Sequence, residues 1–210
     1  MHFFDEILYT DTKKALDSLK QSPAFLNGFY LSGGTALALQ LGHRKSNDLD
    51  WFTKDPFTSQ NKLNDLRPLN PTVTAQNQNT LDAIISGTKV SFLEYPYPLL
   101  REPLSYNEVP ISSVLDIACS KLSAIVSRGS KKDFIDLYFI LQEYSLKNLI
   151  SSFQTKFNGV NYQLPLILKS LIYFADADED PAPDMLIKIS WEEIKTNLTD
   201  TVSKYISTAT

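Results

Sequence analysis

Two acidic residues one position apart, Asp48 and Asp50, have a spacing that suggests metal chemistry. On a β-strand, residues two positions apart point to the same face, so both carboxylates would lie together while Leu49 and Trp51 face the other side. Neighbouring carboxylates repel one another unless a cation lies between them. Mg²⁺ prefers hard oxygen ligands and is commonly bound by one or two carboxylates together with substrate phosphates. We therefore predict that Asp48 and Asp50 bind magnesium.

A second candidate site precedes the acidic pair by one short helix. Residues 29–31 are typical of a buried strand, and the two glycines that follow break this strand with a turn. Residues 35–41 are mostly strong helix formers, and Gly42 stands where a C-terminal cap is expected. The backbone N–H groups and the dipole at the start of such a helix favour an anion. The residues of this predicted phosphate site are Ser32, Gly33, Gly34 and Thr35.

The composition is that of a globular protein, with 210 residues of which 43% are hydrophobic and 21% are charged. The net charge of −4 argues against binding nucleic acid over a wide surface, because such binding usually needs a basic face. Basic residues still cluster in segments 43–45 and 128–132, so a local patch could attract one end of a polyanion.

The sequence also indicates the compartment. Cys119 is the single cysteine, which excludes an intramolecular disulfide and fits a reducing cytoplasm. The N-terminus lacks a secretory signal, and no apolar run reaches the length of a membrane span. We therefore expect a cytoplasmic protein without a membrane segment.

Hydrophobic periodicity predicts strands in the first half of the chain and helices in the second. One or two helices are expected over residues 5–19 and another over 57–66, followed by β-rich runs at 72–78, 81–85 and 89–95. Ser86 and Gly87 mark a hairpin between the last two runs. Helices are expected over residues 113–128, 130–142, 146–157 and 164–174, and from about 190 onward. We expect the acidic segment 176–180 to be a solvated loop.

Three motifs in a fixed order resemble the AbiE-type (abortive infection) nucleotidyltransferase toxins, a family of the polymerase-β-like nucleotidyltransferases. The first motif is the glycine turn, and the second is Arg-x-Ser-x-Asp-Leu-Asp over residues 44–50. The third spans residues 121–138 and contains Lys121, Arg128, Lys132, Asp133 and Asp136 at the family's spacing. The resemblance covers most of the chain.

The resemblance implies an α+β fold, with a polymerase-β-like core of a small mixed sheet and helices followed by a C-terminal helical lobe. We place the nucleotidyltransferase core at residues 1–111 and the helical lobe, which would close the active-site cleft, at residues 112–210. The implied reaction moves a nucleoside monophosphate from a nucleoside triphosphate to an acceptor hydroxyl, with magnesium as cofactor. The implied acceptor is the 3′ end of a transfer RNA, and the implied partner is a cognate antitoxin.

The resemblance also assigns roles to residues of the third motif. Lys121 matches the family's catalytic lysine, which contacts the phosphates of the nucleotide. At least one of Asp133 and Asp136 contributes to the site by holding Lys121 or a substrate hydroxyl. Asp133 stands three residues after Ser130 and could instead close a capping box, so we rank Asp136 ahead as the freer carboxylate. The predicted catalytic residues are Asp48, Asp50, Lys121, Asp136 and Asp133, and the predicted nucleotide-binding residues are Ser32, Gly33, Gly34, Thr35, Arg44 and Ser46.

Polymerase-β-like enzymes often carry a third acidic residue on a later strand, and this chain departs from that pattern. Glu94 would share a strand face with Phe92, opposite to Ser91, and Asp82 lies on the preceding strand. Neither is a convincing ligand. The sequence therefore leaves open whether the site holds two metal ions.

Two other functions fit the same residues. A small-molecule nucleotidyltransferase of the antibiotic-modifying kind would use the same phosphate chemistry but would need an acidic pocket for a cationic acceptor. A non-catalytic protein would bind nucleotide with magnesium and release no pyrophosphate. The sequence does not identify the acceptor, the preferred nucleotide or the oligomeric state.

Overall fold

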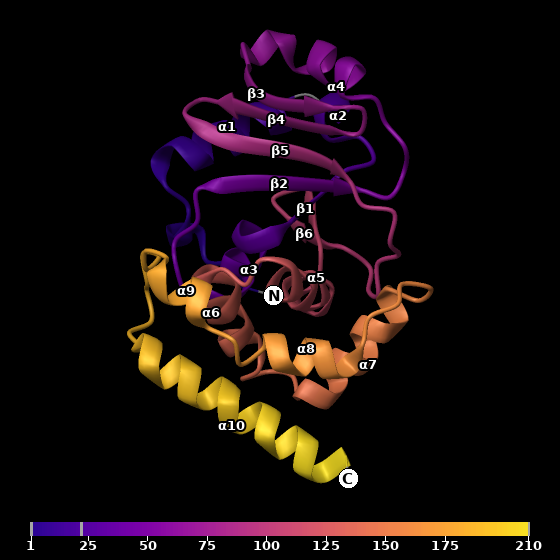
Figure 1. Ribbon diagram of the computed structural model, residues 1–210. Coiled ribbons are helices and arrows are strands. Elements are labelled where there is room, and N and C mark those ends of the chain that lie inside the picture. Colours follow the sequence, from indigo (N-terminus) through magenta and orange to yellow (C-terminus); the bar gives the residue numbers. More distant parts are fainter. Residues whose placement is uncertain (1, 22, 210) are drawn as a thin grey trace. The chain divides into compact units, whose positions relative to one another are not determined.

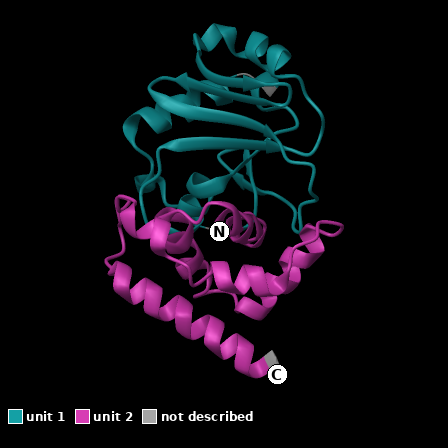
Figure 2. Cartoon of the chain, viewed as in Figure 1, with its two compact units in different colours: residues 1–113 teal, residues 114–210 magenta. Residues whose placement is uncertain are grey.

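The computed structural model describes residues 2–21 and 23–209. The chain forms two compact units, unit 1 (residues 1–113) and unit 2 (residues 114–210), which Figure 2 shows in different colours. Unit 1 contains a seven-stranded mixed sheet, and unit 2 contains a succession of helices. The fold is therefore α+β, as the sequence predicts.

The sheet of unit 1 has both parallel and antiparallel neighbours. Its strands are β1 (Tyr30–Ser32), β2 (Asp48–Thr53), β3 (Thr72–Asn77), β4 (Thr80–Ile85), β5 (Thr88–Glu94), β6 (Leu104–Tyr106) and β7 (Val109–Ile111). They lie in the order β3-β4-β5-β2-β1-β7-β6, and the first four of these run side by side in Figure 1. β1 and β2 are antiparallel to each other, whereas β2 is parallel to β5 and β1 is parallel to β7. The order of strands along the sheet thus brings β1, β2 and β5 together at its centre.

The alternation predicted for β2 is confirmed. Leu49 and Trp51 are completely buried, and Asp48 and Asp50 are half-buried on the opposite face of the strand. Lys62 of the helix over residues 59–66 lies 5.4 Å from the ring of Phe92, which stacks with Trp51. The apolar face of β2 is therefore covered by a helix of unit 1, and the acidic face is the other one.

Three tight hairpins connect neighbouring strands of the sheet, and Gln78 and Asn79 form the turn between β3 and β4. The predicted turn between β4 and β5 has Ser86 and Gly87 in the left-handed region, at φ values of 50° and 82°. The hairpin of β6 and β7 was not predicted, and its turn residues Asn107 and Glu108 have φ values of 47° and 71°. Each of these strands has three residues, which is too short for alternation of polar and apolar residues to be visible in the sequence.

Unit 1 contains the helices predicted over residues 5–19, 35–41 and 57–66, together with two short helices, over residues 23–26 and 67–69, that were not predicted. They are η1 (Asp5–Ile7), α1 (Thr10–Lys20), α2 (Pro23–Leu26), α3 (Gly33–Leu41), α4 (Ser59–Leu66) and η2 (Arg67–Leu69). α3 begins directly at the glycine turn and ends at Gly42, whose φ of 64° is the left-handed conformation of a C-terminal cap. The sequence therefore positions both ends of the helix that follows β1.

Unit 2 has its own hydrophobic core. Its helices are α5 (Val114–Ser127), α6 (Lys131–Ile140), α7 (Leu146–Lys156), α8 (Leu164–Ser170), α9 (Ala175–Glu179) and α10 (Trp191–Ala209). α5 packs against α6, α7 and α8, and α10 packs against α6 and α7 (Figure 1). The helix predicted from about residue 190 onward is confirmed as α10, and its residues Ile194, Leu198 and Val202 are buried.

The prediction of an acidic loop at 176–180 was wrong, because most of this segment is the helix α9. The Asp178 carboxylate accepts hydrogen bonds from Trp191 Nε1 at 2.6 Å and from Lys195 Nζ at 3.0 Å. Asp180 accepts one from the backbone N–H of Lys131 at 2.9 Å. These acids therefore join α9 to α6 and α10, and partners distant in the sequence decide their structure.

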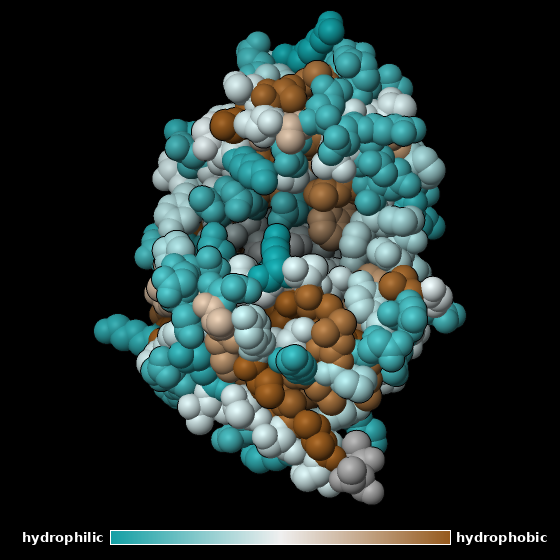
Figure 3. Space-filling view, in the orientation of Figure 1, coloured by the Kyte–Doolittle hydropathy of each residue, from teal (hydrophilic) through white to brown (hydrophobic). Residues whose placement is uncertain are grey.

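Apolar side chains also reach the surface of unit 2. Figure 3 shows hydrophobic residues gathered over its helices, and Leu166, Tyr173 and Ile206 are 51%, 55% and 48% exposed. Among the described residues, no helix combines the length and the apolar composition that a membrane span requires.

Candidate active site

The glycine turn and the acidic pair meet at the centre of the sheet in unit 1. Ser32 at the end of β1 pairs with Asp50 of β2, so their side chains lie on the same face. Gly33 has a φ of +67°, and a Cβ atom added to it would lie 2.5 Å from Asp50 Oδ2. Only glycine therefore allows this carboxylate to approach the backbone at the first turn of α3.

Arg44 brings a positive charge to the same turn. A Cβ atom added to Gly34 would lie 2.5 Å from Arg44 Nη2. The Arg44 side chain is buried, and its Nη1 donates a hydrogen bond to the carbonyl oxygen of Lys45 at 3.0 Å. The two glycines thus make room for one carboxylate and one guanidinium beside the start of α3.

Buried hydroxyl groups fasten the turn to its surroundings. The Thr35 hydroxyl lies 2.7 Å from the Ser46 hydroxyl and donates to the carbonyl oxygen of Asp48. The Ser112 hydroxyl donates to Ser32 Oγ at 2.8 Å. These contacts fix the first turn of α3 against β2, while the backbone N–H groups of the turn remain the groups suited to an anion.

Ser112 was missed in the sequence. It follows β7, and only the pairing of β7 with β1 brings it next to Ser32. Because β7 is too short for its pattern to be recognised, no local signal in the sequence indicates this contact.

The acidic pair suits magnesium by its donor atoms. Asp48 and Asp50 offer hard carboxylate oxygens on one strand face, which matches an ion held by one or two carboxylates plus phosphates of a substrate. Across residues 2–21 and 23–209, no group of three or more His, Cys, Asp or Glu side chains could hold a metal ion. The residues present therefore fit a site that the substrate completes.

The two candidates for a third acidic ligand lie apart from the pair. Glu94 pairs with Thr53, so its side chain is on the face that carries Leu49. Asp82 is on the acidic face but lies one strand beyond Ser91, roughly 10 Å from the backbone of Asp50. Its carboxylate is 3.8 Å from Lys89 Nζ. Neither residue forms a three-carboxylate cluster with Asp48 and Asp50.

In unit 2, Lys121 lies in a buried ionic cluster. Its Nζ is 2.9 Å from Asp133 Oδ1 and 2.6 Å from Asp136 Oδ2. The side chains of the three residues are 9%, 1% and 0% exposed, in the order Lys121, Asp133, Asp136. Spacing alone would have suggested an ordinary solvated lysine, and the structure instead shows a lysine shared by two carboxylates.

Asp133 gathers further partners at the start of α6. Arg128 Nε lies 3.1 Å from its Oδ2, and the Ser130 hydroxyl donates to the same oxygen at 2.8 Å. Burial alone would raise the pKa of Asp133, but the charges and hydrogen bonds of Lys121 and Arg128 outweigh burial and lower it. The Ser130 side chain makes no capping bond to the helix, so the capping-box alternative was wrong.

The description of Asp136 as the freer carboxylate also needs correction. Asp136 was expected to be the freer one, yet its side chain is completely buried and lies closer to Lys121 than Asp133 does. The charged groups of this cluster, Lys121, Arg128, Asp133 and Asp136, are balanced in sign. The cluster therefore fixes the position of the lysine ammonium without adding net charge.

Comparison with known proteins finds relatives over nearly the whole chain. The sequence profile of the family described as Nucleotidyl transferase AbiEii toxin, Type IV TA system, matches residues 80–207. An uncharacterised protein of Aquifex aeolicus (strain VF5) is 38% identical over 211 residues, which cover 95% of this chain and 98% of that protein.

Solved structures with the same fold include two bacterial proteins. JHP933 from Helicobacter pylori has a TM-score of 0.58 at 16% identity, with 98% of this chain and 94% of that chain covered. MenT4, a nucleotidyltransferase toxin from Mycobacterium tuberculosis H37Rv, has a TM-score of 0.57 at 16% identity, with 93% and 85% covered. At such identities the likeness shows a shared fold.

Proposed function

The chain belongs to the AbiEii family of nucleotidyl transferase toxins and is a nucleotidyltransferase, and we propose that it uses magnesium to move a nucleoside monophosphate onto an acceptor hydroxyl. The observation that carries this proposal is the position of Asp48 and Asp50. They share one face of β2, and the Asp50 carboxylate lies against the glycine turn that starts α3. A cation-binding pair and an anion-binding turn are thus side by side, as a metal-bound triphosphate requires.

In this proposal, the turn that starts α3 and the acidic pair of β2 have separate roles. The backbone N–H groups at the start of α3 bind the β- and γ-phosphates of the nucleoside triphosphate, and the guanidinium of Arg44 adds positive charge there. Asp48 and Asp50 hold magnesium, which when bound supplies Lewis-acid neutralisation of phosphate charge. The acceptor hydroxyl loses its proton to water as its oxygen attacks the α-phosphorus, and the bond from this phosphorus to pyrophosphate breaks. Positioning and charge neutralisation are the main requirements of such a transfer.

Unit 2 contributes Lys121 in this proposal. The family resemblance assigns its ammonium to the phosphates of the nucleotide, and Asp133 and Asp136 hold that ammonium in a fixed position. Arg128 and Ser130 hold Asp133 in turn. The two aspartates therefore act through Lys121 as positioning residues.

We further propose that the acceptor is the 3′ end of a transfer RNA, that a cognate antitoxin exists, and that the protein works in the cytoplasm. The toxin family supports the antitoxin, and the resemblance of the motifs supports the RNA acceptor. Incubation with labelled nucleoside triphosphates and either total RNA or a panel of aminoglycosides tests the acceptor. Label on RNA is the expected result, and label on an aminoglycoside would identify a small-molecule enzyme instead.

The assignment of the acidic pair is tested by replacing Asp48 with Asn. The variant should lose about 3 kcal/mol of transition-state stabilisation, a rate loss of about a hundredfold, because the amide lacks the charge that binds the cation. Pyrophosphate release measures the rate. Asp200→Asn is the matched control, since Asp200 is exposed on α10 and should keep the full rate. An Asp48→Asn variant with the wild-type rate would refute the assignment.

A further inference from the structure

Aromatic side chains continue the acidic face of the sheet in unit 1. Tyr30 pairs with Phe52, and this pair is next on the same face after Ser32 and Asp50. By the rise of a β-strand, the two pairs are about 7 Å apart. The ring centroids of Tyr30 and Phe52 are 6.2 Å apart, and those of Phe52 and Tyr95 are 4.8 Å apart. A row of three aromatic rings therefore lies next to the carboxylates of Asp48 and Asp50.

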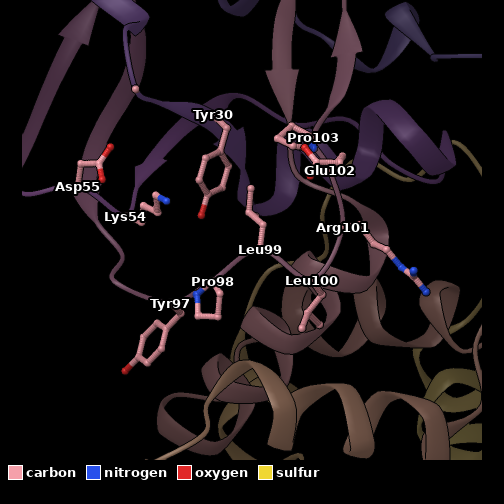
Figure 4. A pocket seen from close by; sticks show the side chains of 11 residues that line it. Tyr30, Lys54, Asp55, Tyr97, Pro98, Leu99, Leu100, Arg101, Glu102 and Pro103 are labelled. Carbon is pink, nitrogen blue, oxygen red and sulfur yellow. The ribbon is translucent and has the colours of Figure 1, made fainter.

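A cavity of about 410 Å³ opens at the Tyr30 end of this row of rings. We call it the Tyr30 cavity, and its wall includes Tyr30, Lys54, Asp55 and the segment 97–103. Figure 4 shows the ring of Tyr30 in the middle of the lining, with Lys54 on one side of it and Leu99 on the other. Its size falls within the usual range of small-ligand sites in proteins.

The lining of the Tyr30 cavity favours a planar, uncharged ligand. Its charged residues are balanced, with Lys54 and Arg101 against Asp55 and Glu102. A polycationic acceptor would need an excess of carboxylates, which this lining does not have. Tyr30, Pro98 and Leu99 instead offer an aromatic ring and apolar surface, the type of wall on which nucleobases stack.

We propose that the Tyr30 cavity is a nucleobase subsite of the transfer reaction. The inference rests on the proposed function, because it takes the reacting phosphates to lie at Asp48 and Asp50. The pair of Ser32 and Asp50 follows the pair of Tyr30 and Phe52 on the same sheet face. A nucleotide with its base in the cavity could therefore place its phosphate or its hydroxyl at Asp50. That nucleotide is either the incoming triphosphate or the terminal nucleotide of the acceptor, and both present the same aromatic ring to Tyr30.

The donor arm of the test compares ligands with and without a base. Binding of each of the four nucleoside triphosphates and of inorganic tripolyphosphate is measured by calorimetry, with magnesium present. Tyr30→Leu removes the ring and retains apolar volume, and Tyr30→Phe keeps the ring as the matched control. If the cavity holds the donor base, Tyr30→Leu weakens nucleotide binding about tenfold and leaves tripolyphosphate binding unchanged, while Tyr30→Phe binds as the wild type does.

The acceptor arm uses a single-stranded RNA with a free 3′ hydroxyl, ending in either a normal or an abasic nucleotide. If the cavity holds the acceptor base, Tyr30→Leu raises the KM for the normal RNA about tenfold and leaves the KM for the abasic RNA unchanged. Leu99→Trp is a second variant, which fills the cavity from a half-buried loop position and should reproduce either pattern. It keeps the test valid if Tyr30→Leu fails to fold.

Either selective pattern supports the subsite and identifies its source. The proposal is wrong if Leu99→Trp changes neither the affinity for nucleotides nor the KM for the normal RNA. It is also wrong if a variant weakens the binding of nucleotides and of tripolyphosphate equally. The proposed function fails separately, if the wild-type protein releases no pyrophosphate with any acceptor. In that case base-selective nucleotide binding that depends on Tyr30 would still establish the cavity as a nucleobase-binding site.

Discussion

Burial and charge act in opposite directions on the carboxylate of Asp133. Its pKa is below the ordinary value of 3.8, because Lys121 and Arg128 together outweigh the cost of burial. The ionised carboxylate therefore stabilises the fold fully above about pH 5, and this contribution is lost as the pH falls below 3.8 through the lowered pKa. Asp133→Asn should lower the free energy of unfolding by about 3 kcal/mol at neutral pH, since it leaves Lys121 buried with one carboxylate fewer.

Urea unfolding of the wild type and Asp133→Asn across a pH series measures this difference. The difference should be constant from about pH 5 to 7 and should shrink below 3.8. Asp200→Asn, at an exposed position, should show almost no difference at any pH. A difference that grows as the pH falls would contradict the lowered pKa.

Cys119 provides a test of the core of unit 2. Burial raises the pKa of its thiol to about 12, and the side chain is completely buried. Because the thiolate is the reactive form, the native thiol should react with a disulfide reagent at pH 8 about a thousandfold more slowly than the unfolded chain. Absorbance of the released chromophore, with and without urea, gives both rates. Native and unfolded rates within tenfold of each other would mean that this core opens readily.

The burial of single charged residues is what the sequence predicts least well. The seven-residue spacing of Lys121 and Arg128 predicts one helix face for both, but Arg128 lies just beyond the end of α5, and the spacing does not indicate what covers Lys121. Asp136 is fifteen residues from Lys121, and only the packing of α6 on α5 brings their charges to 2.6 Å. The local sequence pattern thus identifies the charged residues that could form a site, and tertiary contacts decide which charges surround each of them.

At the scale of the elements, the glycine that joins β1 to α3 can be tested against a second glycine. Gly33 and Gly159 both have left-handed backbone angles, with φ values of +67° and +91°. Substitution by Ala should cost each about 1–2 kcal/mol of stability. At Gly33 the new Cβ would also lie 2.5 Å from Asp50 Oδ2, whereas at Gly159 nothing lies within 4 Å.

Gly33→Ala should therefore lose nucleotide transfer by about a hundredfold, because it displaces a carboxylate that we place at the metal. Gly159→Ala should keep the wild-type rate at a similar loss of stability, so it controls for backbone strain. Thermal unfolding and pyrophosphate release measure the two effects. If both variants release pyrophosphate at the same rate, the position of the Asp50 carboxylate is not important for catalysis.

The elements that the sequence predicts correctly are those with local signals. The glycine turn, α3 and the alternation of β2 all follow from residues within one segment, and the structure contains each of them. The hairpin of β6 and β7 depends on pairing with β1, and α9 depends on contacts with α6 and α10. Such elements have no signal of their own in a single sequence.

At the scale of the whole molecule, the basic clusters of the sequence contribute less surface charge than their number suggests. Arg44 is 3% exposed at the turn of α3, and Lys131 is 8% exposed. The Lys131 ammonium binds the carbonyl oxygens of Asp178 and Asp180. Two of the five Lys and Arg side chains in segments 43–45 and 128–132 are therefore buried, and a net charge of −4 means that the whole chain has no excess of positive charge for a nucleic-acid backbone.

The binding of an RNA acceptor should accordingly depend only weakly on salt. Each phosphate of a single strand that the protein neutralises adds about −0.7 to the slope of log affinity against log salt concentration. Contact with one end of the RNA, through about three phosphates or fewer, predicts a slope no steeper than about −2. Titration of a fluorescent RNA at several salt concentrations gives this slope. A slope of about −5 or steeper would require a wide basic surface, and the acceptor would then have to be bound along its length rather than at its 3′ end.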